Sequence, residues 1–150
     1  MIQKNKIRTE EIEKKISDIL DTVEIIRDNL PDTYEEFLAL GLVKDGLYKK
    51  AEYALESVID ICNILNSDMR LGVPDTEDSL LDNLEKNKVF NKNIIELIRQ
   101  MKGFRNILVH KYGDIDDSKA YEDIKDGLPD FETVIKDIEK FIETHKKKNI

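Results

Sequence analysis

The stretch from which the rest of the chain can be read is Gly103-Phe104-Arg105-Asn106-Ile107-Leu108-Val109-His110-Lys111-Tyr112-Gly113. In it an arginine, a histidine and a tyrosine interrupt an otherwise apolar run. The chain has 2 histidines, and the second, His145, lies among lysines near the carboxyl end. Chemistry that needs a titratable ring is therefore expected at His110.

Upstream of this stretch, apolar residues recur every three or four positions, as in an amphipathic helix. They predict a helix over 91–109 with the stripe Ile94, Leu97, Ile98, Met101, Phe104 and Leu108. The same pattern predicts long helices over 9–30, over 44–67 and from 129 onward, and short ones over 33–41, 76–85 and 118–125. No segment alternates with a period of two, so no sheet is expected. The predicted fold is all-α, an antiparallel four-helix-type bundle with short accessory helices.

Local signals indicate where these helices begin and end. Thr9 is predicted to be an N-cap, and Thr33 begins a capping-box pattern. Gly41 is expected to close the short helix before it, and Gly127 to close another. Pro129 suits the first turn of a helix, so the last helix is expected to begin there.

Composition narrows the class of protein. A length of 150 residues predicts a single domain over 1–150. The net charge of −8 argues against a broad basic surface that tracks phosphates, although one local basic site stays compatible with it. No apolar run approaches the ~20 residues of a membrane helix, and no secretory signal is visible. Cys62, the single cysteine, fits an apolar stripe and is expected to be buried. These features together predict a cytoplasmic protein with no membrane partner.

The spacing of the motif raises a geometric question. An α-helix turns about 100° per residue, which places Arg105 and Tyr112 on one face and His110 about 140° round from Arg105. One straight helix therefore does not bring the guanidinium and the imidazole together. The helix can end or distort near His110, with Lys111-Tyr112-Gly113 turning away, or two copies of the motif can meet across a twofold axis. We expect both, and hence a homodimer.

The residue types in the motif fit RNA cleavage. An arginine fork matches phosphate oxygens and stabilises charge that develops on a scissile phosphate. A histidine takes or gives a proton near neutral pH, and RNA supplies its own nucleophile, the 2′-OH. We therefore predict RNA cleavage without metal or cofactor, with Arg105 and His110 as catalytic residues. The residues predicted to bind RNA or to support the site are Asn106, Lys102, Lys111 and Tyr112.

Plainer interpretations compete with these. An arginine beside an apolar stripe often only extends its charged end to water, and a histidine near a helix end often caps carbonyls. For Lys102 and Lys111 a surface role is the favoured interpretation. Asp60, one residue off the stripe of its helix, is expected to be a solvated or rim residue, and its alternative role is to pair with Arg105.

The pattern Arg105-x4-His110-x-Tyr112, the long helix before it and the Gly72-Val73-Pro74 turn resemble the HepT-like branch of the HEPN superfamily, a set of small toxin ribonucleases. The resemblance covers most of the chain. It implies a dimer with a composite cleft and an endoribonuclease toxin of a type VII-like toxin–antitoxin pair. It also implies a minimal nucleotidyltransferase antitoxin that transfers AMP to Tyr112 and thereby blocks RNA entry.

Two other functions stay open from the sequence. The chain can be a non-catalytic helical subunit that docks a nucleotidyltransferase and presents its substrate, or a plain structural dimer. RNA cleavage that persists in EDTA and depends on the motif distinguishes the enzyme from both.

Overall fold

The computed structural model describes residues 6–148, and within that range it contains helices and no strand. The elements are α1 (Thr9–Asn29), α2 (Tyr34–Leu38), α3 (Leu42–Asp68), α4 (Glu77–Lys86), α5 (Lys92–His110), the 3-10 helix η1 (Tyr112–Asp114) and α6 (Asp117–Lys148). The predicted all-α class is confirmed. No helix of this described part is long and apolar enough to cross a membrane.

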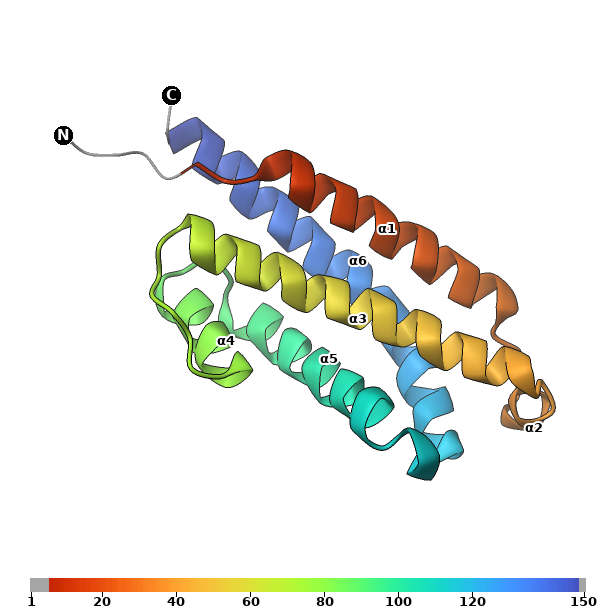
Figure 1. The fold of residues 1–150 in the computed structure, drawn as a ribbon. Coiled ribbons are helices and arrows are strands. Elements are labelled where there is room, and N and C mark those ends of the chain that lie inside the picture. The colour runs from red at the N-terminus through yellow and green to blue at the C-terminus, as the bar shows by residue number, and fades with distance from the viewer. Residues whose placement is uncertain (1–5, 149–150) are drawn as a thin grey trace.

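The four long helices form an antiparallel bundle (Figure 1). α1 packs on α3, α3 packs on α5, and α6 packs against both α1 and α5. The short helix α2 lies at one end of the bundle and α4 lies toward the other (Figure 1). This arrangement confirms the predicted four-helix architecture with accessory helices.

The core forms because each long helix buries its apolar stripe. α3 packs against α1 on one side and α5 on the other, so its apolar surface is wider than a single stripe. Cys62 lies in that surface and is fully buried. Burial raises the pKa of its thiol to about 12, so the side chain behaves as a small hydrophobe, as predicted.

The capping signals had mixed outcomes. The Thr33 hydroxyl oxygen accepts a hydrogen bond from the Glu36 N–H at 3.2 Å, which confirms the predicted cap. The Thr9 prediction was wrong, because its hydroxyl donates to the Ile7 carbonyl at 3.3 Å and caps nothing. Gly41 does not close a helix. It adopts φ +61°, a conformation that favours glycine, and directly precedes α3.

The largest departure from prediction is α6. The prediction of a separate short helix closed by Gly127 and a new helix from Pro129 was wrong. The helix α6 runs unbroken through both residues (Figure 1). Pro129 has no N–H to give, so the helical partner of the Lys125 carbonyl is lost. A continuous apolar stripe outweighs this local cost. The buried residues of that stripe are Ala120, Tyr121, Ile124, Leu128, Phe131, Val134, Ile135, Ile138 and Ile142.

Candidate functional site

Arg105 lies inside the bundle. On α5 it follows Ile98 and Met101 and precedes Leu108 at steps of three, four and three, so it occupies a core-facing position. Only 7% of the residue is exposed. A guanidinium at such a position needs anionic partners, because burying an unpaired charge is very costly.

Three side chains accept hydrogen bonds from the guanidinium, and two of them are carboxylates. Nη1 donates to the Glu56 carboxylate on α3 at 2.6 Å, and Nη2 donates to the Glu77 carboxylate on α4. Nε donates to Oδ1 of Asn106 at 2.9 Å. Burial by itself lowers the pKa of Arg105, but the hydrogen bonds to Glu77 and Glu56 outweigh it and raise that pKa above its ordinary value. α3, α4 and α5 therefore meet at a guanidinium that stays charged.

The two carboxylates lie between Arg105 and solvent. The Glu56 and Glu77 side chains are 46% and 39% exposed, whereas the Arg105 side chain is 8% exposed. A phosphate that approaches from solvent must displace at least one carboxylate to reach the arginine fork. The exchange is chemically matched, because carboxylate and phosphate bind the fork in the same bidentate way.

His110 is the last residue of α5 and is exposed. The Lys111 N–H closes the helix by donating to the Ile107 carbonyl at 3.0 Å. The expectation that the helix ends near His110 is thus confirmed. Within residues 6–148 no hydrogen bond or ion pair joins His110 to Arg105. In one chain the guanidinium is therefore bonded to Glu56, Glu77 and Asn106 and not to the imidazole.

Tyr112 follows in η1, outside α5, so the chain turns away after His110 as expected, and Tyr112 does not share a helix face with Arg105. Its side chain is largely open to solvent, with 53% of the residue exposed. Partial desolvation and the nearby Asp45 carboxylate raise the pKa of the Tyr112 phenol, while Lys44 opposes them. The first turns of α3 are therefore the electrostatic neighbours of this tyrosine.

The remaining candidates are the cations Lys102 and Lys111 and the carboxylate of Asp60. Lys102 contacts the Asp78 carboxylate and is neutralised there. Lys111 is exposed at the end of α5. Asp60 pairs with Lys15 at 3.7 Å, which agrees with its favoured rim role. Its alternative role as the partner of Arg105 was wrong, because Glu56, one helical turn earlier on α3, takes that place.

Comparison with known proteins places this geometry in a family. Residues 19–138 match the family model described as Ribonuclease HepT-like, which is well over half of the chain. The chain belongs to the HepT-like ribonuclease family. The HEPN resemblance seen in the sequence is thereby confirmed.

Individual relatives agree with the HepT-like assignment. The mRNA nuclease HepT of Shewanella oneidensis is 27% identical over 93 residues, which cover 62% of this chain and 70% of that protein. A mutant of the toxin–antitoxin MntA–HpeT is 26% identical, with a TM-score of 0.77, and covers 86% of this chain and 98% of its own. The tri-AMPylated HEPN toxin of Shewanella oneidensis in complex with MNT antitoxin is 25% identical, with a TM-score of 0.76, over 86% of this chain and 96% of its own. The cytosolic protein of unknown function YutE from Bacillus subtilis is 18% identical over 92% of each chain and, with a TM-score of 0.77, shows the fold alone.

Two residues of this HepT-like chain were missed by sequence reasoning, namely Glu56 and Glu77. The signal for a buried Arg105 was present, since its spacing from Ile98, Met101 and Leu108 continues the core line. An arginine at a core-facing position implies acidic partners on the neighbouring helices, but the spacing does not identify them. Glu56 and Asp60 are four residues apart on one face of α3, and the packing alone decides between them.

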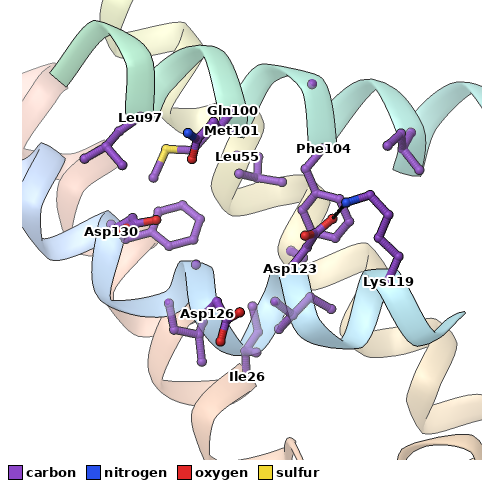
Figure 2. A pocket seen from close by; sticks show the side chains of 17 residues that line it. Ile26, Leu55, Leu97, Gln100, Met101, Phe104, Lys119, Asp123, Asp126 and Asp130 are labelled. Atoms are coloured by element: carbon purple, nitrogen blue, oxygen red, sulfur yellow. Dashed lines mark ion pairs between the residues drawn. The ribbon is translucent and has the colours of Figure 1, made fainter. Parts of the chain in front are cut away.

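A groove of about 400 Å³ lies between α5 and α6 and contains neither Arg105 nor His110 (Figure 2). Phe104 and Leu97 are among the apolar residues that line it, and Asp123, Asp126 and Asp130 stand along the α6 side. Burial, and then the charge of Asp126, raises the pKa of Asp130. Lys119 pairs with Asp123 at 3.6 Å, and the remaining two carboxylates leave the groove with a negative charge that disfavours a phosphate chain.

Proposed function

We propose that this protein is the metal-independent endoribonuclease toxin of a type VII-like HEPN/nucleotidyltransferase toxin–antitoxin pair. The observation that carries the proposal is Arg105-x4-His110-x-Tyr112 at the exposed end of α5, in a chain of the HepT-like family. RNA is the proposed substrate, and its 2′-OH is the proposed nucleophile.

In the proposed reaction the 2′-oxygen attacks the adjacent phosphorus and the bond to the 5′-oxygen breaks. The products are a 2′,3′-cyclic phosphate and a 5′-hydroxyl. His110 takes the 2′-OH proton or gives a proton to the leaving 5′-oxygen, for which its exposure at a helix end is suitable. Arg105 stabilises the charge of the phosphorane-like transition state once phosphate replaces a carboxylate on its fork.

A homodimer supplies what one chain lacks. Within the described chain no hydrogen bond or ion pair joins Arg105 to His110, so a second copy is the proposed source of a cleft where both groups face one phosphate. Two His110 residues across such a cleft divide the base and acid roles. A mixed dimer with one His110→Ala copy should therefore lose most of its activity, and one with full activity would count against the divided roles.

The test of the enzyme uses RNA in EDTA and variants with matched controls. Cleavage should persist in EDTA and fall about 10²–10⁴-fold in both Arg105→Ala and His110→Ala. Arg99→Ala is the control for arginine, because Arg99 lies on the same helix and also pairs with two carboxylates, those of Asp78 and Asp82. His145→Ala is the control for histidine.

Each control should keep wild-type activity. Circular dichroism identifies any loss in Arg105→Ala that comes from unfolding, and His110→Ala tests the chemistry without disturbing the core. A wild-type chain that cuts no RNA but binds a nucleotidyltransferase tightly would support the non-catalytic docking subunit instead.

The proposed neutralisation is AMP transfer to Tyr112 by a nucleotidyltransferase antitoxin. The phenolic oxygen attacks the α-phosphorus of ATP, pyrophosphate leaves, and the phenol proton passes to a base or to water. The exposure of Tyr112 supports this role, as does the tri-AMPylated state of the related HEPN toxin. Intact mass after co-expression should show AMP increments that Tyr112→Phe abolishes, whereas Tyr53→Phe, another exposed tyrosine, should keep them.

A further inference from the structure

The 3-10 helix η1, which begins with Tyr112, joins α5 to α6 at the end of the bundle where α2 and the start of α3 also lie (Figure 1). The Lys44 ammonium donates to the Asp117 carboxylate at 2.9 Å, and the Tyr48 hydroxyl donates to the same carboxylate. These bonds hold the first turn of α6 against the first turns of α3. Asp45, in the same part of α3, acts on the Tyr112 phenol. The α5–α6 connection and the start of α3 therefore form one continuous surface.

Apolar side chains are exposed on the elements that meet at this end of the bundle. Leu42 is 85% exposed, Val43 48% and Tyr112 53%, and Leu38 and Val109 are 43% and 44% exposed. These five residues are called the Tyr112 corner below. Single exposed apolar residues are ordinary, but a group of them marks an interaction site. Of the 9 large hydrophobic residues in the described range that are this exposed, more than half belong to the corner.

Folding does not explain the leucine at position 42. Leu42 is the first residue of α3, where an acidic side chain would suit the helix dipole better. With 85% of its surface in water it adds almost nothing to the core. Leu42 and Asp45 are three residues apart and share a helix face, with Cβ atoms about 5–6 Å apart. Leu42 thus lies one helical turn from the carboxylate beside Tyr112.

We propose that the Tyr112 corner is the docking surface for the nucleotidyltransferase that modifies Tyr112, with Leu42 and Val43 as its apolar anchors. This inference rests on the proposed AMP transfer. A specific protein interface buries ~800 Å² on each partner, far more than one tyrosine offers. An enzyme whose active site closes on the Tyr112 hydroxyl therefore covers residues one helical turn away. Exposed apolar residues at that distance match the usual apolar centre of an interface.

The charges on the α3 side of the corner favour a protein over RNA as the occupant of Leu42 and Val43. The carboxylates of Asp45, Asp114 and Asp116 surround Tyr112 in space or in the chain, and Asp114 and Asp116 are exposed. Lys44, the nearest cation on α3, is already paired with Asp117. RNA bound at His110 and Lys111 therefore gains little by extending to the α3 side, whereas a folded partner can cover the leucine and valine there and leave the carboxylates at the rim.

The experiment measures AMP uptake by the full chain from ATP and purified nucleotidyltransferase. Initial rates are followed by intact mass over a range of concentrations of this chain, for wild type, Leu42→Ser, Val43→Ser and the double variant. Val73→Ser is the matched control, because Val73 is 95% exposed in the connection between α3 and α4, at the other end of the bundle (Figure 1). Leu42→Met keeps an apolar anchor and tests whether apolar character is what matters.

The double variant should raise KM for this chain about tenfold or more, with kcat little changed, since anchors act on binding. Its thermal stability and RNA cleavage should match wild type, and Val73→Ser and Leu42→Met should keep the wild-type KM. An unchanged KM in the double variant, an equal rise in Val73→Ser, or dissociation of a dimer by the double variant would each overturn the docking surface. A wild-type chain that takes up no AMP overturns the proposed neutralisation and the docking surface with it.

Discussion

At the scale of single residues, Arg105 must have its buried charge paired and must also be able to bind a phosphate, and these two requirements oppose each other. Its partners Glu56 and Glu77 satisfy a buried charge, yet the same carboxylates occupy the donors that a phosphate would use. Both carboxylates reach solvent, and partly exposed ion pairs are weak. The guanidinium is therefore held firmly enough for folding and loosely enough for exchange.

Removing one of the two carboxylates that pair with Arg105 should strengthen RNA binding. Glu77→Gln keeps an acceptor for Arg105 and removes a negative charge, so RNA affinity should rise about two- to fivefold, as ~0.4–1 kcal/mol of removed repulsion implies. The measurement is binding of an RNA oligonucleotide in the His110→Ala background. Asp82→Asn is the control, because this substitution removes an equal charge from α4, but Asp82 contacts Arg99 and not Arg105.

An equal gain in Asp82→Asn would mean that net charge alone is responsible. With both Glu56→Gln and Glu77→Gln, the buried guanidinium has no anion, and the free energy of unfolding should fall by about 1–3 kcal/mol. Urea unfolding measures that loss.

At the scale of elements, α6 shows that a long stripe overrides local breakers. Gly127 lies within the helix, and a Cβ there would meet nothing within 4 Å. The existence of the four long helices was predictable because apolar residues recur every three or four positions along each of them. The continuity of α6 was not, because the cost of Pro129 is local whereas the gain from packing comes from other helices.

Gly127→Ala should raise the free energy of unfolding by about 0.5–1 kcal/mol, because glycine in a helix interior loses more backbone entropy than alanine. Gly41→Ala is the opposite control, since its φ of +61° is strained for any residue with a Cβ. Chemical denaturation of both variants measures the changes. A loss of stability in Gly127→Ala would contradict the unbroken helix.

The contact between α3 and α6 should depend on pH through Asp117. Partial burial by itself raises the pKa of Asp117, but the hydrogen bonds from Tyr48 and Lys44 outweigh it and lower the pKa below its ordinary value. Because the folded pKa is below the unfolded one, the stabilisation is complete above pH ~4 and is lost as pH falls through the lowered value. Asp117→Asn should therefore cost stability at pH 7 and progressively less below pH ~4.

Urea unfolding at a series of pH values measures this difference. Asp114→Asn, an exposed aspartate in the same connection, should change stability little at any pH. A constant deficit of Asp117→Asn down to pH ~2 would contradict the role of the carboxylate charge.

At the scale of the whole molecule, acidic residues outnumber basic ones, 32 to 24. Near the motif, Arg99, Lys102 and Arg105 are all paired with carboxylates. RNA therefore meets few free cations, and binding is expected to rest on one or two phosphate contacts.

The salt dependence of RNA binding should accordingly be shallow. From 50 to 200 mM salt, the affinity of the His110→Ala variant for single-stranded RNA should fall less than about tenfold. Fluorescence anisotropy at several salt concentrations gives the slope. A fall of about a hundredfold or more would indicate many phosphate contacts along a basic surface. The net charge of −8 argues against such a surface.

The candidate site was predictable in its residue types and not in its arrangement. Arg105, His110 and Tyr112 stood out because polar groups interrupt an apolar run. The direction of Arg105 into the core and its two glutamates depend on how α3 and α4 pack beside α5. The surroundings of Tyr112 depend on the contact between the starts of α3 and α6, which are more than seventy residues apart in the chain.

The unequal surroundings of the arginine and the histidine bear on how such a gene would decay. Arg105 joins three helices, whereas no side-chain hydrogen bond or ion pair of the described chain engages the His110 imidazole. A descendant released from selection for toxicity would still lose stability on losing the arginine, while substitution of its histidine would cost the fold little. Among inactive copies, loss of the imidazole should therefore come first, and a retained guanidinium is poor evidence that a copy still kills.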